Sequence, residues 1–263
     1  MRERRLVFGE VADLYDRHRP AYPDRLIDDV VALAELDGSR AVLEVGAGTG
    51  KATALFAARG IPVVAVEPSA EMATVWRRTC SAYADVAIEE SDFERWDPAG
   101  RRFPLLFSAQ AWHWVQPATR YAKAAAALSP RGVVAVFWNR VAWDRSSLRE
   151  ELLRAYREAA PELPLDGAMH PANVHPDADE DWQGEIAAVD GLTDAEVRHY
   201  DWSLDYSAGD YVGLLATLSE IRLLDDERRE RLFGAVRAVI DAHGGALTLP
   251  LRTRLCLARR ADV

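Results

Sequence analysis

Three glycines alternate along the chain directly after a short apolar run. They are Gly46, Gly48 and Gly50, which follow the run 41–45 and precede a helix-type pattern. Glycine accepts backbone conformations with positive φ, and without a side chain it lets a ligand approach the main chain closely. The segment therefore predicts a strand, a ligand-binding turn and a helix, although an ordinary strand-to-helix turn has the same pattern.

An acidic residue, Glu67, closes the next apolar run of the chain. It stands about 20 residues beyond the glycine turn, where a carboxylate can accept hydrogen bonds from both hydroxyls of a ribose. A dinucleotide-binding G-x-G-x-x-G turn would need its third glycine where Lys51 stands. The pair of turn and acid therefore favours a ligand that contains adenosine, and it leaves an NAD-dependent oxidoreductase as a remote alternative.

The composition is that of a globular protein with an acidic balance. The chain has 263 residues, of which 49% are hydrophobic, and its net charge of -10 disfavours binding to nucleic acid. Cys80 and Cys256 lack metal-ligand spacing, and no window reaches the ~20 apolar residues of a membrane span. We therefore expect no bound metal, no nucleic-acid partner, no membrane partner and a cytoplasmic location.

Strand-type runs alternate with helix-type periodicity up to residue 140. Two helices are expected within 10–36, broken at Pro20 and Pro23, with Asp24 as the N-cap of the second. The alternation predicts a parallel α/β sheet that is covered on both faces. The expected strands are 41–45, 62–66, 86–89, 104–108 and 132–138, and the expected helices between them are 49–59, 69–79 and 117–128.

The pattern changes after Asn139. A polar helix at 147–159 leads into a proline-rich stretch, 161–182, that has no periodicity and predicts a loop-rich lid. We predict one domain, 1–263, with a helical cap at 1–36, a cofactor-binding core at 37–140, a lid or insertion at 141–195 and C-terminal strands and helices at 196–263. In the last part, strands are expected at 196–204 and 246–257, and helices at 208–218 and 225–243.

The segment 44–50 together with Glu67 resembles the class I S-adenosylmethionine-dependent methyltransferases, whose motifs are an E/D-x-G-x-G-x-G turn and an acid closing the second strand. The resemblance covers roughly residues 5–140, and the part after Asn139 looks like the small-molecule subgroup that includes trans-aconitate methyltransferase-like proteins. It implies a Rossmann-like doubly wound sheet of seven strands, five parallel with a C-terminal antiparallel pair. It also implies methyl transfer from S-adenosylmethionine to an oxygen, nitrogen or carbon of a small molecule, releasing S-adenosylhomocysteine.

Further segments extend the resemblance. Residues 91–94 are similar to the acidic-aromatic pair that brackets adenine, residues 107–114 to the motif of the fourth strand, and Tyr15 to Tyr22 to a segment that folds over the methionine end of the cofactor. The cofactor-binding residues that this implies are Tyr15, Arg19, Glu44, Gly46, Gly48, Gly50, Glu67, Pro68, Met72, Asp92, Phe93, Ser108 and Ala109.

Individual roles follow from side-chain chemistry. Glu44 is expected to anchor the methionine ammonium, directly or through water, or else to stabilise the turn. Asp92 can accept a hydrogen bond from the adenine amino group, and Phe93 can pack against the ring. Met72 suits the adenine wall and the protein core equally well.

His113 is the candidate catalytic residue because it follows the fourth strand and imidazole can carry a proton near neutral pH. Displacement at a sulfonium depends mainly on positioning and desolvation, so we favour the alternative that His113 shapes the pocket between Trp112 and Trp114.

Other residues have weaker signals. His170 and His175 with the aspartates at 177, 179 and 181 lack the spacing of metal sites, which predicts a solvated loop. Arg19, Arg140 and Arg145 are candidates for a substrate carboxylate. The tryptophans that either line an aromatic acceptor pocket or pack the core and lid are Trp138, Trp143, Trp182 and Trp202.

Two alternatives to small-molecule methylation remain. One is a protein or nucleic-acid methyltransferase, but the N-P-P-Y-type motif that reaches a flipped base is absent, and Ser108-Ala109-Gln110 stands in its place. The other is a regulatory protein that binds S-adenosylmethionine without turnover. The expected partner is thus a small-molecule substrate, with the chain as a monomer or homodimer.

Overall fold

The computed structural model describes residues 12–167, 169–174 and 181–262. His175, Asp177 and Asp179 lie outside these residues. Within them the chain forms two compact units: unit 1 takes its residues from 1–20, 139–180 and 201–252, and unit 2 from 21–138, 181–200 and 253–263. The division of one domain into four parts stays a prediction.

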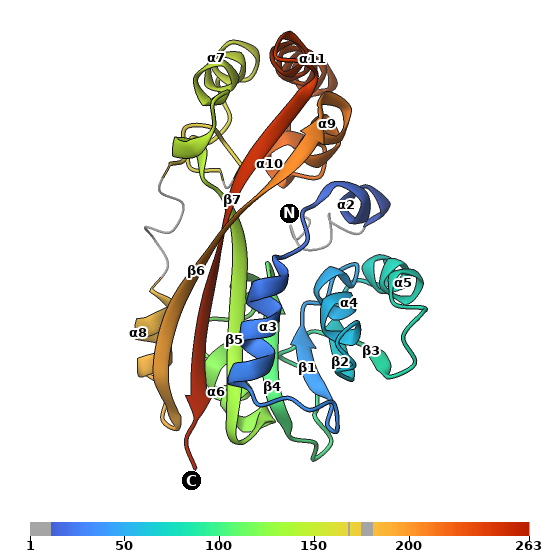
Figure 1. Cartoon of the computed structure of the whole chain (residues 1–263), viewed down its shortest axis with the longest axis vertical. Coiled ribbons are helices and arrows are strands. Elements are labelled where there is room, and N and C mark those ends of the chain that lie inside the picture. Colours follow the sequence, from blue (N-terminus) through green and yellow to red (C-terminus); the bar gives the residue numbers. More distant parts are fainter. Residues whose placement is uncertain (1–11, 168, 175–180, 263) are drawn as a thin grey trace. The chain divides into compact units, whose positions relative to one another are not determined.

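A seven-stranded sheet runs through the structure (Figure 1). Its strands are β1 (Val42–Val45), β2 (Val63–Glu67), β3 (Val86–Glu90), β4 (Phe103–Ala109), β5 (Leu128–Val141), β6 (Leu192–Ser207) and β7 (Ala246–Arg260). Their order is β3-β2-β1-β4-β5-β7-β6. The first five pair in parallel, whereas the arrow of β7 points opposite to those of β5 and β6 in Figure 1. The predicted sheet of five parallel strands with a C-terminal antiparallel pair is confirmed.

Unit 2 has helices on both faces of its strands, and the sequence of β5 shows why. Val133, Ala135 and Phe137 join one apolar core with residues of α3 (Asp24–Leu33) and α4 (Lys51–Ala57). The alternate residues Val134, Val136 and Trp138 join a second core with α6 (Arg120–Ala127) and α8 (Trp182–Ala187). Successive side chains of a strand point to opposite faces, so a strand buried on both sides reads as an unbroken apolar run.

The strand order creates a switch point beside β1. The chain leaves β1 for β2 and β3 on one side and then crosses to β4 on the other. In open α/β sheets, ligands bind at the carboxyl ends of the strands at such a point. The glycine turn follows β1 there, and the short helix η2 (Trp112–Trp114) follows β4.

Unit 1 has a core of its own. Its helices are α2 (Ala12–His18), the short η3 (Trp143–Arg145), α7 (Arg149–Ala159), α9 (Ala208–Leu215), α10 (Ser219–Arg222) and α11 (Asp226–Ala242). Leu152 of α7, Leu214 of α9 and Leu232 of α11 are fully buried in this core. The His18 ring lies against α9, where a Cβ on Gly213 would come within 2.6 Å of it. No helix within the described ranges is long and apolar enough to cross a membrane.

Several expected boundaries need correction. Pro23, not Asp24, is the N-cap of α3, and the Asp24 carboxylate instead pairs with Arg59 at 2.9 Å. The helix expected from 117 begins only at Arg120. The stretch 161–182 leads directly into α8, a helix that periodicity did not indicate, which Asp181 caps by accepting a hydrogen bond from the Gly184 N–H at 2.8 Å.

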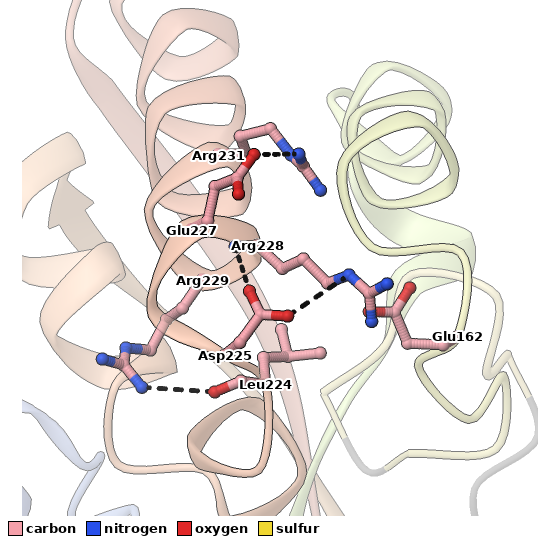
Figure 2. A network of polar contacts seen from close by, with 7 residues as sticks. All are labelled: Glu162, Leu224, Asp225, Glu227, Arg228, Arg229 and Arg231. Carbon is pink, nitrogen blue, oxygen red and sulfur yellow. Dashed lines mark hydrogen bonds and ion pairs between the residues drawn. The ribbon is translucent and has the colours of Figure 1, made fainter.

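Asp225 starts the longest helix of the structure, α11 (Figure 2). Its Oδ1 accepts a hydrogen bond from the Arg228 backbone N–H at 2.8 Å, and its Oδ2 lies 3.5 Å from the Arg228 guanidinium. That guanidinium also contacts Glu162, just beyond α7, at 3.1 Å. One carboxylate thus caps α11 and orients an arginine toward the neighbouring helix.

We expect Asp225→Ala to lower the free energy of unfolding by about 1 kcal/mol, because one backbone donor of α11 loses its acceptor. Asp225→Ser should regain most of this loss, since its hydroxyl caps the helix while the exposed ion pair contributes little. Asp226→Ala, one position further on, removes a largely exposed carboxylate that pairs with Arg229 and does not cap the helix, and it is the control. Urea unfolding measures all three, and a serine variant as unstable as the alanine variant would contradict a capping role.

Candidate functional site

The three glycines of the turn have positive φ angles of 72°, 55° and 89°, but they serve different purposes. A Cβ on Gly46 would lie 2.4 Å from the Ala111 Cβ, and one on Gly50 would lie 2.8 Å from the Cys80 Sγ. A Cβ on Gly48 would meet nothing within 4 Å. Gly46 and Gly50 therefore allow close packing inside unit 2, whereas Gly48 alone keeps open space beside the backbone.

Glu67 ties two turns together at the end of β2. Its Oε2 accepts a hydrogen bond from the Gly48 N–H and its Oε1 one from the Ser69 N–H, both at 2.9 Å. Burial raises the pKa of Glu67, while the two N–H donors act in the opposite direction. Because a carboxylate offers about four lone-pair positions, two further donors can still bind to it.

Glu44 lies beneath the turn and is 1% exposed. It accepts a hydrogen bond from the Thr53 hydroxyl, which itself accepts one from the Trp76 indole N–H at 2.8 Å. Burial, with a smaller contribution from the nearby Glu67, raises the pKa of Glu44 to about 8. The Glu44 carboxyl group is thus largely protonated at neutral pH. A cation bound beside it would lower its pKa and favour its ionised form.

The residues after β3 divide into a half-buried acid and a core aromatic. The Asp92 carboxylate lies 3.8 Å from the guanidinium of the exposed Arg95. The Phe93 ring is 3% exposed and packs at centroid distances of 6.2 Å from Trp96 and 5.9 Å from Trp112. Contact of either residue with adenine stays a prediction. The same holds for Met72, which is buried on α5 (Ala70–Thr79), and for Pro68, which is exposed.

The end of β4 is fixed to the end of β1. The Ser108 hydroxyl is fully buried and donates to the Val45 carbonyl at 2.7 Å. Two residues later Gln110 has a left-handed φ of 58°, rare outside glycine, and its N–H donates to the Phe137 carbonyl at 2.9 Å. This bend carries Ala111 onto Gly46. Gln110 lies within the fourth-strand motif, but nothing in its residue type indicated such a conformation.

The helix η2 presents His113 at the surface beside this contact. The residue is exposed, and its Nδ1 accepts a hydrogen bond from the Trp138 indole N–H at 3.3 Å. Trp138 and Trp182 are buried in unit 2, and Trp143 is buried in unit 1, as the core-packing interpretation expects. Trp202 is partly buried against the core of unit 1.

The remaining candidates belong to unit 1. The Arg19 guanidinium donates to the Thr217 hydroxyl at 2.7 Å and lies 5.1 Å from the centre of the Tyr15 ring. The roles of Tyr15 and Arg19 in cofactor binding stay predictions, as does a clamping role for Arg140. Arg145 forms an ion pair with Asp201 at 2.9 Å.

The expectation of a solvated loop is wrong for His170, which is 6% exposed. Its ring stands edge-on to Tyr156, and its Nδ1 accepts a hydrogen bond from the Ala172 N–H at 3.1 Å. Burial lowers the pKa of His170. Among the residues that the structure describes, no three His, Cys, Asp or Glu side chains are grouped so as to hold a metal ion.

Known proteins share the segment that carries this site. The family model described as "Methyltransferase domain" matches residues 42–132. The uncharacterized methyltransferase Rv3342 of Mycobacterium tuberculosis is 36% identical over 148 residues, which are 55% of this chain and 58% of that protein. The chain thus matches little more than half the length of this relative.

Solved structures share the fold at low sequence identity. Phospholethanolamine N-methyltransferase 2 of Haemonchus contortus, solved with phosphomonomethylethanolamine and S-adenosylhomocysteine, has a TM-score of 0.54 at 14% identity, over 97% of this chain and 57% of that one. The cyclase SpnF has a TM-score of 0.55 at 16% identity, over 98% and 94% of the two chains. These likenesses show the fold alone, which hosts more than one reaction.

The buried Glu44 predicts a pH dependence of stability. A carboxyl group whose pKa is higher in the folded chain stabilises the fold below its ordinary pKa and loses that contribution as the pH rises through the folded value. For Glu44 this window runs from 4.5 to about 8. Glu44→Gln keeps an acceptor for Thr53 but cannot ionise. Between about pH 5 and pH 9 its unfolding free energy should fall less than that of the wild type, by on the order of a few kcal/mol.

Urea unfolding across this pH range measures the difference. Glu90→Gln is the matched control because Glu90 is an exposed glutamate at the end of β3, two strands away in the same sheet, and it should follow the wild-type curve. Parallel curves for Glu44→Gln and the wild type would show that Glu44 is not the buried ionising group.

Proposed function

We propose that this protein, whose residues 42–132 match the family model of a methyltransferase domain, is a class I methyltransferase that transfers the methyl group of S-adenosylmethionine to a small-molecule acceptor and releases S-adenosylhomocysteine. The observation that carries the proposal is the pair formed by Glu67 and Gly48. The carboxylate holds the one glycine of the turn whose Cβ direction is open.

The residues present fit the cofactor at three points. The open space at Gly48 suits the close approach of the amino-acid part to the backbone. The remaining lone pairs of Glu67 suit two ribose hydroxyls. The buried carboxyl of Glu44 suits a cationic group, because an ammonium beside it would favour its ionised form.

Asp92 and Met72 are the residues proposed for the adenine end. Asp92 follows β3, the strand next to β2. Ser91, which links Asp92 to the last residue of β3, donates its N–H to the Glu67 carbonyl at 3.2 Å. This bond brings the end of β3 to the ribose-binding acid. A carboxylate in that place can accept a hydrogen bond from an exocyclic amino group.

When bound, S-adenosylmethionine supplies a methyl group on a positively charged sulfonium. The chain's own part is to hold the acceptor in line with that group and to exclude water. The Ser108–Val45 hydrogen bond and the Gly46–Ala111 contact fix the loop after β4 against the glycine turn. His113, two residues beyond Ala111, is the side chain that we propose for the acceptor side of the site.

A small-molecule acceptor accounts best for the charge and the motif after β4. The net charge of -10 opposes binding to a phosphate backbone. Residues 108–110 replace the motif by which methyltransferases reach a flipped base. The atom that accepts the methyl group is an oxygen, nitrogen or carbon.

Glu67→Ala should weaken binding of S-adenosylmethionine about 10- to 150-fold, which corresponds to roughly 1.5–3 kcal/mol for hydrogen bonds to a charged group. Equilibrium dialysis with labelled S-adenosylmethionine measures the change. Glu90 of β3 is the residue in register with Glu67 of β2, but its side chain is exposed. The Glu90→Ala variant should therefore bind S-adenosylmethionine like the wild type. Unchanged affinity in a folded Glu67→Ala protein would remove the assignment of the ribose site.

Turnover separates the proposed enzyme from a regulatory binder. The wild type, incubated with S-adenosylmethionine and a protein-free metabolite extract, should accumulate S-adenosylhomocysteine, and Glu67→Ala should do so far more slowly. Accumulation with a protein or nucleic-acid fraction but not with the metabolites would instead indicate a macromolecular acceptor.

A further inference from the structure

The imidazole of His113 is held from one side by the last strand residue of β5 in unit 2. The Trp138 indole N–H donates to Nδ1 at 3.3 Å, and the ring of Trp114 contacts that of His113 at a centroid distance of 4.8 Å, with the two planes tilted by 45°. The preceding residue of β5, Phe137, accepts the hydrogen bond from the left-handed Gln110. Two successive residues of β5, Phe137 and Trp138, therefore anchor the loop after β4, one at its bend and the other at the histidine.

The direction of the Trp138 indole is itself fixed by a buried stack. Trp182 of α8 stacks on Trp138 at a centroid distance of 4.5 Å with 27° between the ring planes, and the Arg120 guanidinium covers Trp182 at 4.2 Å. Arg120 is 4% exposed and forms a two-pronged ion pair with Glu185, and it also donates to the Trp112 carbonyl at 3.1 Å. A buried, ion-paired arginine cannot easily rotate away, so the three stacked groups hold the indole in place.

The hydrogen bond decides which nitrogen of His113 carries the proton. An indole N–H can only donate, so Nδ1 must be the bare nitrogen of a neutral imidazole, and Nε2 must carry the hydrogen. For Nε2 to act as a base, the proton would have to move to Nδ1 and break the bond to Trp138. The geometry therefore makes Nε2 a donor.

We propose that Trp138 is a positioning residue that fixes His113 as a hydrogen-bond donor toward the methyl acceptor. The acceptor substrate then carries a hydrogen-bond-accepting oxygen or nitrogen, such as a carboxylate, carbonyl or phenolate oxygen, beside the atom that is methylated. His113 holds that group through Nε2–H and removes no proton from it. This inference rests on the proposed methyl transfer for its functional meaning, but the hydrogen bond itself can be tested without any substrate.

The test follows the indole N–H signals of the full-length protein by ¹H–¹⁵N NMR between about pH 5 and pH 8.5, the range in which imidazoles titrate. Protonation of His113 turns Nδ1 into a donor and breaks the bond. The Trp138 indole signal, assigned from Trp138→Phe, should therefore shift with the same midpoint as the His113 ring. In His113→Asn the amide oxygen can still accept from Trp138 but does not titrate, so the shift should disappear.

The Trp96 indole, which donates to Glu89 at 2.6 Å, serves as the internal control and should not follow the His113 midpoint.

Long-range ¹H–¹⁵N correlations of the wild-type imidazole at about pH 8 supply the second measurement. They should show the hydrogen of His113 on Nε2. A hydrogen on Nδ1, a Trp138 indole signal that ignores the titration, or a shift that persists in His113→Asn would each overturn the proposal.

Binding of S-adenosylhomocysteine separates this proposal from the proposed function. Trp138→Phe keeps the aromatic stack and should bind within about twofold to threefold of the wild type, a difference well under 1.4 kcal/mol. Lost binding in that variant alone would make Trp138 part of the cofactor site and overturn the positioning role. If the wild type fails to bind, the proposed function fails, while the indole titration still reports on the His113–Trp138 hydrogen bond.

Discussion

The rest of the site depends on the two backbone hydrogen bonds that the Glu67 carboxylate accepts. It receives backbone N–H groups from Gly48, in the turn after β1, and from Ser69, in the turn after β2. Hydrogen bonds to an ionised acceptor are about twice as strong as neutral ones. One buried side chain thus joins the two loops, in addition to the backbone hydrogen bonds that Gly46 and Ala47 donate to the Val66 carbonyl of β2. The third loop, which follows β4, is attached to the end of β1 by the Ser108–Val45 hydrogen bond and by the contact of Ala111 with Gly46.

This arrangement places two acids, Glu44 and Glu67, in a site that water reaches poorly. Burial raises the pKa of both, the Glu67 carboxylate raises that of Glu44 further, and the Asp92 carboxylate raises that of Glu67. A fold selected for stability alone would avoid such a pair. A ligand with positive charge changes the balance, because a cation beside a buried carboxyl group favours its ionised form. The unfavourable burial of these two acids and the proposed affinity for a sulfonium and ammonium compound therefore have the same physical origin.

The strands and the glycine turn could be predicted from the sequence because their signals are local. A strand covered on both faces, such as β5, is a continuous apolar run, and alternating glycines mark a turn whatever surrounds it. The predicted N-cap of α3 differs from the observed one by one residue. Aspartate is a common N-cap residue type, which favours Asp24, but Pro23 has the extended conformation that precedes the helix. Long-range contacts explain the larger errors. The helix α8 depends on Trp182 stacking with Trp138 and Arg120, which are distant in sequence.

The site residues divide in the same way. Glu67 and Gly48 could be found from spacing, because spacing along a strand and its turn fixes their place. The separate purposes of Gly46 and Gly50 could not, since they depend on Ala111 and Cys80 from other elements. Nor could the left-handed Gln110 or the burial of His170, because neither residue type favours what the surrounding chain imposes.

The ends of β1 and β2 form the proposed binding site for the adenosyl cofactor. Calorimetric titration of the purified full-length protein with S-adenosylmethionine, S-adenosylhomocysteine and NAD⁺ in parallel, after any bound cofactor has been removed, tests it most directly. We expect saturable micromolar binding of the two adenosyl compounds and no binding of NAD⁺. A folded, cofactor-free protein that binds NAD⁺, or that binds neither adenosyl compound, would contradict it.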